Sequence, residues 1–196
     1  MRKRSAAAED KGGYRTLISI PGYEVGGILL SEEEIAARVA ELGQRITQDY
    51  AGEKLLVIGI LKGAFVFMSD LIRQIDLDLE TDFMAASSYG SGTESSGEVR
   101  ITKEPGVDLA GRHVLLVEDI VDSGITLKYL KDTYFADRDI RSVKICALLD
   151  KPARRKADIT PDYKGFTVDD RFIVGYGLDY REHFRQLPHI TYLVEK

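Results

Sequence analysis

The sequence predicts an α/β fold in which helices flank a twisted, mostly parallel sheet. Three short runs rich in Val, Ile and Leu, at residues 55–61, 114–117 and 142–149, have the continuous hydrophobicity of strands that are buried on both faces. A helix-like stretch follows each of the first two runs, and such alternation is typical of parallel strands joined by right-handed crossovers. With 196 residues, the chain suits one domain with a sizeable core.

The first part of the chain contains a clear helix signal. Residues 1–14 are expected to form a flexible tail, and residues 15–30 mix apolar pairs with Pro and Gly, which favours an extended peripheral segment. Ser31 and Glu34 then have the spacing of a capping box, and the apolar residues that follow recur at helical intervals. We therefore predict a helix that begins at Ser31 and continues to about Tyr50.

The next strand ends beside a cation. Residues 55–61 are followed by Lys62 and Gly63, and then by a predicted helix over residues 64–72. At the carboxyl end of a buried strand, Lys62 either contacts a phosphorylated ligand or caps a surface turn. Residues 80–89 and 98–103 are predicted strands, and the polar, Gly/Ser-rich segment between them is either a flexible active-site loop or a plain hairpin connection.

The central stretch combines acids with a glycine-containing turn. The apolar run 114–117 is followed by Glu118 and Asp119, then by Asp122 and the turn at residues 123–126. Open α/β sheets bind ligands outside the carboxyl ends of their strands. The backbone N–H groups and hydroxyls of such a turn suit a phosphate, the paired acids suit a ribose diol with magnesium nearby, and Asp122 is free for acid–base chemistry. The alternative is a strand that ends in solvated acids which cap the next helix.

The remaining elements follow the same alternation. A helix is predicted from residue 124 to about residue 136, and the strand over residues 142–149 ends in Asp150 and Lys151. Lys151, at a strand end, is placed to donate to a carbonyl oxygen. The neighbouring cluster of Arg154, Arg155 and Lys156 is interpreted as a solvated surface. Residues 172–176 are strand-like, and core packing is the simplest interpretation of Phe172.

Composition excludes several classes of protein. The net charge of −5 disfavours a general nucleic-acid binder, which usually has a basic surface. The single cysteine, Cys146, lies in an apolar run and is interpreted as a buried core thiol, so no disulfide framework exists and a reducing compartment is favoured. The basic start of the chain lacks the apolar region of a secretory signal, and no segment has membrane-spanning length. We therefore expect a cytoplasmic protein without a membrane partner.

The central string V-x-x-V-E-D-I-V-D-S-G-x-T resembles the phosphoribosyl-diphosphate (PRPP) motif of type I phosphoribosyltransferases, and its E-D-I-V-D-S-G form is similar to the hypoxanthine-guanine branch. Further landmarks follow the family order: L-K-G at 61–63, S-S-Y at 87–89, Lys151, and F-I-V-G-Y-G-L-D-Y at 172–180. The resemblance extends over roughly residues 20–194. It implies the type I phosphoribosyltransferase fold for residues 15–196, with a core at about 31–151 and a small hood from about 15–30 and 152–196.

The resemblance also implies a role for each site residue. PRPP would be held by Glu118, Asp119, Asp122, Ser123, Gly124, Ile125, Thr126 and Leu127, although Ile125 departs from the polar or basic residue that other members often have. Pyrophosphate would be held by Leu61, Lys62, Gly63 and Arg185, often with a cis peptide bond at Leu61–Lys62. The purine would be bound by Lys151, Phe172, Ile173 and Asp179, and Mg2+ by Asp179, Glu118 and Asp119. Catalysis would use Asp122 at the purine N7, with Ser88 and Tyr89 in the flexible loop.

The implied activity is purine salvage, in which a homodimer or homotetramer transfers the phosphoribosyl group of PRPP to N9 of a 6-oxopurine. Two alternatives stay open at this point. A xanthine- or guanine-preferring transferase is one, because Lys151, Phe172 and Ile173 do not distinguish these bases. The other is a non-catalytic regulator that binds nucleotides and RNA on the same fold. Such a regulator would need a basic face, and regulators of this kind lack the pattern that this chain has at Lys151, Phe172 and Asp179.

Overall fold

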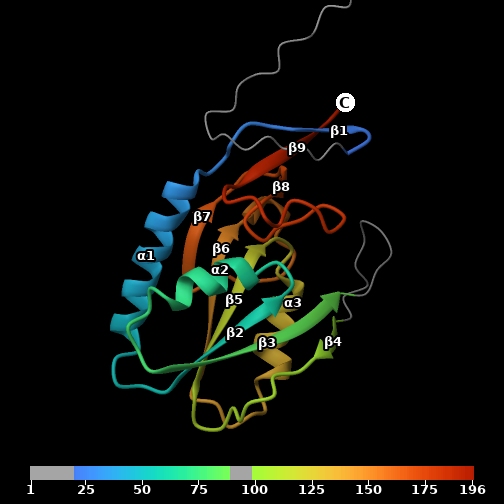
Figure 1. Ribbon diagram of the computed structural model, residues 1–196. Helices are drawn as coiled ribbons and strands as arrows, with labels where there is room; N and C mark the ends of the chain where they lie inside the picture. The colour runs from blue at the N-terminus through green and yellow to red at the C-terminus, as the bar shows by residue number, and fades with distance from the viewer. Residues whose placement is uncertain (1–19, 89–98) are drawn as a thin grey trace, which may run out of the picture.

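The computed structural model describes residues 20–88 and 99–196, which form a large and a small sheet with helices on both faces of the large one (Figure 1). The strands of the large sheet are β2 (Leu55–Leu61), β3 (Leu79–Ser88), β4 (Val99–Lys103), β5 (His113–Val121), β6 (Ser142–Asp150) and β7 (Tyr163–Thr167). The small sheet contains β1 (Tyr23–Val25), β8 (Phe172–Val174) and β9 (Thr191–Glu195). The helices are α1 (Glu32–Asp49), α2 (Phe65–Ile72) and α3 (Ile125–Tyr129), with a π-helical turn η1 (Leu130–Tyr134) and a 3-10 turn η2 (Pro152–Arg154).

The large sheet has the strand order β4-β3-β2-β5-β6-β7. All neighbours pair in parallel except β4, which pairs antiparallel with β3 at one edge. Five strands therefore end at the same edge of the sheet, below the small sheet in Figure 1. This arrangement confirms the predicted α/β fold with a mostly parallel sheet, and it brings the loops after these strands together at one end of the molecule.

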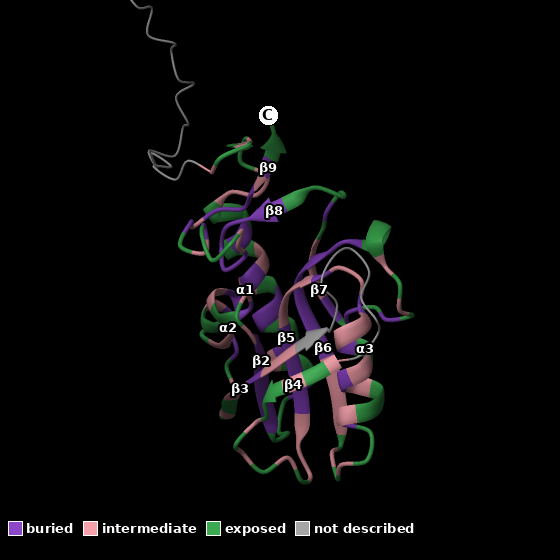
Figure 2. Ribbon diagram, turned by 90° about the vertical axis from the view of Figure 1, so that its right-hand side faces the viewer, coloured by how far each residue is buried: buried purple, intermediate pink, exposed green. Residues whose placement is uncertain are grey.

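Side chains of successive strand residues enter opposite faces of the sheet. Leu55 and Val57 of β2 join the core beneath α1 and α2, whereas Leu56 and Ile58 join the core beneath α3 and η1. Figure 2 shows α1 and α2 on one side of the sheet and α3 on the other. Burial on both faces explains why the central strands lack an alternation of apolar and polar residues.

The helices begin where the sequence predicted. Ser31 caps α1, since its side chain accepts a hydrogen bond from the Glu34 N–H at 3.2 Å, and the Glu34 carboxylate accepts one from the Ser31 N–H at 2.8 Å. The predicted helix at 124–136 is present as α3 followed by η1, so its second half widens into a π turn. Cys146 is buried in the core, as expected, and burial raises the pKa of its thiol.

The small sheet joins the two ends of the described chain. β9 pairs antiparallel with β1 on one side and with β8 on the other. β7 pairs with β6, so this part of the segment predicted as hood, 152–196, belongs to the large sheet. The boundaries between core and hood stay a prediction, as does the tail at 1–14, which lies outside the described residues.

Three other differences from the sequence analysis concern the strands β5, β7 and β9. β5 continues to Val121 rather than ending at Val117, because β6 keeps pairing with it as far as Val121 and Asp150. β7 and β9 are short strands that hydrophobicity did not reveal. Over residues 20–88 and 99–196, no helix combines the length and apolarity needed to cross a membrane.

Candidate active site

A cavity of about 270 Å³ lies at the carboxyl edge of the large sheet and is also lined by residues of β8 in the small sheet. Its walls come from the ends of β5 and β6, from β8 and from the loop that joins β8 to β9. Its lining residues are Asp119, Ile120, Asp122, Lys151, Arg154, Asp170, Arg171, Phe172, Ile173, Leu178 and Asp179. The fold therefore brings together acids from the central stretch, the lysine after β6 and the aromatic residue of β8.

The paired acids lie inside β5, not beyond its end. Asp119 accepts a hydrogen bond from the Ile120 N–H at 2.7 Å, and Oε2 of Glu118 is buried without a hydrogen-bond partner. Neither acid caps the next helix, because the cap residue of α3 is Gly124 and no side chain bonds to it. The alternative of solvated capping acids is therefore wrong, since β6 extends the strand past them.

Both acids are costly to ionise in this position. Burial, followed by the charge of Asp119, raises the pKa of Glu118 well above its ordinary value. Burial raises the pKa of Asp119 to about 6, although the Ile120 N–H and the guanidinium of Arg185 act in the opposite direction. A ligand that presents hydroxyl donors or a divalent cation to this edge would stabilise the ionised forms.

Asp122 has an acceptor atom with nothing bound to it. Its Oδ1 is buried and has no hydrogen-bond partner, and the residue lines the cavity. Buried acceptors are normally satisfied, so an unpaired carboxylate oxygen on a residue that lines a cavity indicates a place for a donor from a ligand.

The turn after Asp122 is fixed by a glycine. Gly124 has φ +77°, and a Cβ there would lie 2.6 Å from Cγ2 of Ile159, so only glycine fits. Oγ of Ser123 accepts a weak hydrogen bond from the Ile125 N–H at 3.4 Å. Thr126 is partly buried, and Leu127 packs in the core below α3. Leu127 therefore offers a ligand its backbone only.

The loop after β2 packs directly against these acids. The Leu61–Lys62 peptide bond is cis, as the resemblance implied. Gly63 lies so close to Asp119 that a Cβ would be 1.6 Å from its Oδ2. On its other side the carbonyl oxygen of Gly63 would lie 2.2 Å from a Cβ at Gly177. Two loops and strand β5 thus pack so closely that only glycine fits at Gly63 and Gly177.

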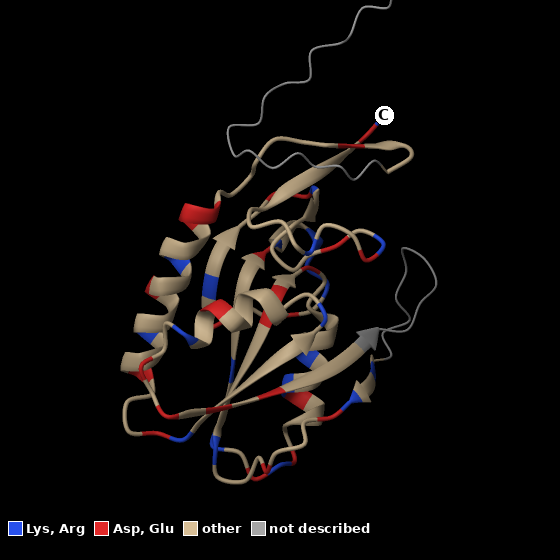
Figure 3. Ribbon diagram, in the orientation of Figure 1, with Lys and Arg blue, Asp and Glu red and all other residues tan. Residues whose placement is uncertain are grey.

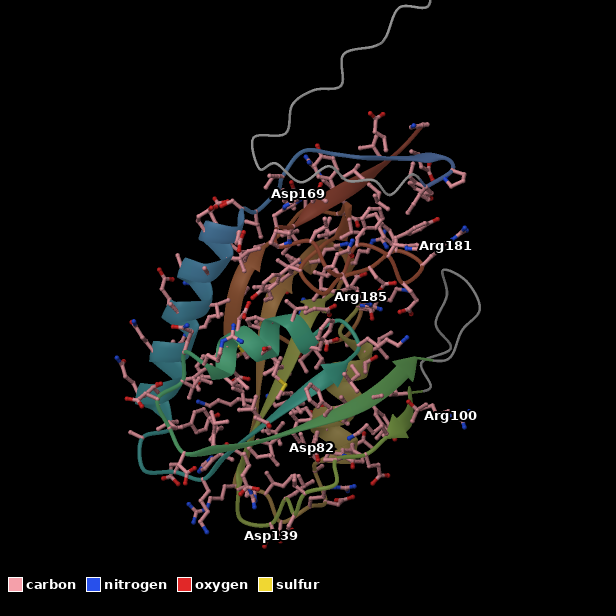
Figure 4. All side chains as sticks on the ribbon, in the orientation of Figure 1. Asp82, Arg100, Asp139, Asp169, Arg181 and Arg185 are labelled. Carbon is pink, nitrogen blue, oxygen red and sulfur yellow. The ribbon has the colours of Figure 1, made fainter. Side chains whose placement is uncertain are left out.

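Residues of opposite charge occur in the loop between β8 and β9, which Figure 3 colours blue and red. Arg185 forms an ion pair with Asp179 at 2.8 Å and donates to the carbonyl oxygen of Gly177 at 2.7 Å, while its Nε is buried without a partner. Nζ of Lys62, on the loop after β2, lies 3.1 Å from Oε1 of Glu182. Figure 4 places Arg185 between the two sheets, whereas Arg181 extends outward from the same loop.

The remaining wall carries a buried cation and an exposed ring. Lys151 is only 5% exposed, and its Nζ donates to the carbonyl oxygen of Arg171 at 2.8 Å. The Phe172 side chain is 51% exposed, so its interpretation as a core residue is wrong, while Ile173 next to it is buried. An aromatic face at the rim of a cavity, with an ammonium group nearby, suits a flat heterocycle with an oxygen acceptor.

The comparisons with known proteins agree with this geometry. Residues 26–181 match the phosphoribosyl transferase domain family. The chain belongs to the phosphoribosyltransferase family. Over 171 residues it is 53% identical to a hypoxanthine-guanine phosphoribosyltransferase of Bacillus subtilis, a match that covers 87% of this chain and 94% of that protein. A Streptococcus pneumoniae protein of the same name is 48% identical over 173 residues, or 88% and 96% of the two chains.

Solved structures show the same relationship. A crystal structure of a hypoxanthine phosphoribosyltransferase from Staphylococcus aureus superposes with a TM-score of 0.84 and 49% identity, and the match covers 87% of this chain and 92% of that one. The chain therefore has the type I phosphoribosyltransferase fold that the central motif implied. The assignment of individual site residues stays a prediction.

Not all predicted site residues of this phosphoribosyltransferase are described. Tyr89 lies outside the described residues, and of Ser88 only the backbone, at the end of β3, is described. Within the described residues, no three or more His, Cys, Asp or Glu side chains lie close enough together to hold a metal ion. A magnesium site here would therefore need oxygen atoms from a substrate, which is the usual way in which proteins bind this ion.

Sequence reasoning missed one buried cation. Arg154 and Lys156 are exposed, as predicted, but the side chain of Arg155 is only 16% exposed and forms an ion pair with the buried Asp150. The interpretation of Arg155 as a solvated residue is thus wrong. Three consecutive basic residues contain no signal that distinguishes the one turned inward, because η2 is too short to produce a periodic pattern.

The close contact at Gly63 gives a first prediction. The variant Gly63→Ala should lower kcat/KM for PRPP by about 10²-fold or more, since the new Cβ must displace Asp119 or the loop from the reacting geometry. Initial rates at varied PRPP concentration measure this effect. Gly27→Ala is the matched control, because nothing lies within 4 Å of a Cβ there. Unchanged kinetics in Gly63→Ala would show that the packing of this loop on Asp119 is not needed.

Proposed function

We propose that this phosphoribosyltransferase transfers the 5-phosphoribosyl group of PRPP to N9 of hypoxanthine, and also of guanine, in purine salvage. In the reaction, the C1′–N9 bond forms as the bond from C1′ to the pyrophosphate oxygen breaks, and Asp122 takes or shares the proton on N7. The products are the nucleoside 5′-monophosphate and pyrophosphate. The identity of about one half to hypoxanthine-guanine phosphoribosyltransferases, over most of the chain, supports this activity.

The unpaired Oδ1 of Asp122 is the observation that carries the proposal. Asp122 lines a cavity whose lining also includes the buried Lys151 and the exposed Phe172. A purine that stacks on Phe172 and accepts a hydrogen bond from Lys151 through its 6-oxo group would present its imidazole edge to Asp122. A carboxylate acceptor in that position can bind the N7 proton as N9 attacks.

The ribose and leaving-group contacts are assigned on the same basis. Glu118 and Asp119 would accept hydrogen bonds from the ribose hydroxyls, and the turn at 123–127 would hold the 5′-phosphate. Lys62 with its loop and Arg185 would hold the departing pyrophosphate, for which a guanidinium group is well suited. Holding both reactants in line gives the attack the advantage of an intramolecular reaction.

Magnesium fits the acids at this edge. Asp119 and Asp179 repel each other electrostatically even with the guanidinium group of Arg185 beside them, and the buried Oε2 of Glu118 has no hydrogen-bond partner, so further positive charge at this edge would be favourable. We propose that Asp179, Glu118 and Asp119 face a Mg2+ ion that is carried by PRPP. The ion supplies charge neutralisation for the pyrophosphate group when it is bound.

The loop at residues 89–98 lies outside the described residues, so its role rests on the resemblance alone. We propose that Ser88 and Tyr89 help to close the site during the reaction, since an oxocarbenium-like transition state must be protected from water.

The choice of base depends on Lys151. A lysine donates and does not accept, so it favours a 6-oxopurine over adenine, whose 6-amino group is also a donor. This argument does not separate hypoxanthine, guanine and xanthine.

The non-enzymatic alternative is a regulator that binds RNA, which would need a basic face. Figure 3 shows acidic and basic residues interspersed over the described elements, and the net charge is −5, so this alternative is disfavoured.

A spectrophotometric assay with PRPP and magnesium tests the proposal. Hypoxanthine, guanine, xanthine, adenine and uracil are offered separately, and turnover of hypoxanthine or guanine that stops when magnesium is chelated is the expected result. Turnover of xanthine above both would move the assignment to a xanthine-preferring enzyme. An absence of turnover with every base, together with tight nucleotide binding, would overturn the enzyme assignment.

A second prediction concerns Glu182. Its two carboxylate oxygens lie 3.1 Å from Nζ of Lys62 and 3.4 Å from Nη2 of Arg185, so it shares both cations that we assign to pyrophosphate. The hydrogen bond from Lys62 is the main reason why the pKa of Glu182 is lowered. Glu182→Gln removes the competing negative charge and should tighten product inhibition by pyrophosphate roughly two- to fivefold.

Inhibition constants for pyrophosphate measure this change. Glu41→Gln is the control, since Glu41 is an exposed carboxylate on α1 that pairs with Arg38 and does not line the cavity. Weaker inhibition by pyrophosphate in Glu182→Gln would mean that this carboxylate holds the two cations in place instead of competing for them.

The cytoplasm is the proposed location, because the single cysteine is a buried thiol. We also propose a homodimer or homotetramer, on the family resemblance. Size-exclusion chromatography with light scattering distinguishes these states from a monomer.

A further inference from the structure

Arg155, which the proposed mechanism does not use, contacts the backbone that leads into the turn at residues 123–126. Its Nε donates to the carbonyl oxygen of Asp122 at 3.0 Å, and its Nη2 donates to that of Val121 at 3.2 Å. It also donates to the carbonyl oxygen of Ile159 and to the carboxylate of Asp150. The guanidinium group therefore donates hydrogen bonds to the backbone before the turn and to the neighbouring Asp150 and Ile159.

The backbone beside Arg155 extends the same pattern by one residue. The N–H of Lys151 donates to the carbonyl oxygen of Val121 at 3.0 Å. The N–H groups of Lys156 and Ala157 donate to the carbonyl oxygen of Ser123 at 2.9 and 3.1 Å. Three consecutive carbonyl groups, at residues 121–123, are thus turned toward the segment 151–157 and held there.

This orientation has a direct consequence for the amide groups of the turn. In a planar trans peptide the N–H points away from the C=O of the same unit. Because the carbonyls of residues 121–123 point toward Arg155 and its neighbours, the N–H groups of Asp122, Ser123 and Gly124 point to the opposite side. Successive backbone N–H groups that converge in a turn form an anion-binding nest.

Gly124 connects the side chain of Arg155 to the shape of this nest. A Cβ at Gly124 would lie 3.0 Å from Cδ of Arg155, so the turn packs against the arginine stem as well as against its charged group. The charge itself is balanced by Asp150, which is buried and also lies 3.4 Å from Nζ of Lys164. The cation is therefore fixed behind the turn and is not available as a ligand contact.

We infer that Arg155 is a positioning residue that orients the N–H groups of residues 122–124 toward the 5′-phosphate of the substrate. The inference rests on the proposed function, which places that phosphate at the turn. Lysine cannot replace it fully, because one ammonium group cannot donate in the fixed fork that reaches three carbonyls and a carboxylate together. Arg155 thus acts through the turn and does not touch the substrate.

The test compares the binding of inosine 5′-monophosphate with that of inosine. The dissociation constant of inosine divided by that of the monophosphate isolates the contribution of the phosphate. We expect Arg155→Met to lower this ratio by about tenfold or more, with inosine itself bound within about threefold of the wild type. The ratio for Arg155→Lys should lie between those of the wild type and Arg155→Met. Arg141→Met is the control, because Arg141 is an exposed residue that pairs with Glu53 away from the cavity.

The outcomes separate the inference from the proposed function. If the wild type does not prefer the monophosphate, the proposed function fails, and the variants are not needed to decide it. If the wild type prefers it and both variants keep the full ratio, the role of Arg155 is overturned. Arg155→Lys retains the charge and serves as the test if Arg155→Met does not fold. If Arg155→Lys weakens the binding of inosine 5′-monophosphate and of inosine by the same factor, Arg155 only supports the structure, and the inference is overturned.

Discussion

Asp122→Asn is expected to lower kcat by about 10²–10⁴-fold while KM for PRPP changes by no more than a few fold. Asparagine has the same shape, so the turn and its contacts with Arg155 should persist, since they involve the backbone carbonyl of residue 122. An amide oxygen accepts a hydrogen bond but does not take a proton at neutral pH. The variant should therefore bind PRPP and fail at the proton transfer from N7.

Initial rates with varied PRPP and varied hypoxanthine measure the two constants separately. Asp132→Asn is the control, because Asp132 is an exposed residue that forms an ion pair with Lys128 and lies outside the cavity. Equal kcat in Asp122→Asn and wild type would remove Asp122 from its proposed role as the base. A large rise in KM for PRPP at unchanged kcat would instead assign it to ribose or phosphate binding.

Asp119→Asn is expected to abolish most activity and yet to make the ligand-free protein more stable. Activity should fall by roughly 10²-fold or more in kcat/KM for PRPP, because the variant loses the carboxylate that we propose to face the ribose hydroxyls and magnesium. Stability should rise near neutral pH because burial raises the pKa of Asp119 to about 6, so the folded protein carries an unfavourable charge there.

The sign follows from proton binding. The pKa of Asp119 in the folded state lies above its unfolded value, so the folded state binds more protons between about pH 4 and pH 6, and the free energy of unfolding falls as the pH rises through this window. Above about pH 6 the free energy of unfolding has lost the whole of this contribution. Asparagine avoids this loss, which we estimate at roughly 1–3 kcal/mol at pH 8 and close to zero at pH 4. It can still accept the hydrogen bond from the Ile120 N–H.

Urea denaturation of the ligand-free protein and of Asp119→Asn at pH 4, 5, 6 and 8 measures the difference. The gap between the two should open as the pH rises. A variant that is less stable than the wild type at pH 8, or one that keeps full activity with PRPP, would contradict the argument that function is the reason for this buried charge.

Much of the fold could be predicted from local patterns. The capping box at Ser31 sets the start of α1, and the apolar runs match the bounds of β2 and nearly those of β6. The end of β5 could not be predicted in this way. Polar residues usually mark the end of a buried strand, but here Glu118 and Asp119 stay in the strand because β6 continues to pair with it.

The residues of the candidate site also fall into two groups, those that local sequence predicts and those that depend on tertiary contacts. Residues that stand at strand ends, such as Lys62 and Lys151, could be proposed from sequence because parallel strands end at one edge. The cis bond before Lys62 could be expected only through the family resemblance. Arg155 and Glu182 could not be proposed, since their importance comes from tertiary contacts: one guanidinium reaches back to a turn about 30 residues earlier, and one carboxylate meets cations on two loops.

The pairing of β1 with β9 also bears on how the protein is made. Tyr23 and Glu195, which face each other in the small sheet, are 172 residues apart, so Tyr23 leaves the ribosome long before Glu195 does. All six strands of the large sheet are complete once Thr167 has emerged, whereas Phe172 pairs with Leu193 and must wait for it. A nascent chain would therefore form the wall of the cavity that comes from β5 and β6 before the wall that comes from β8.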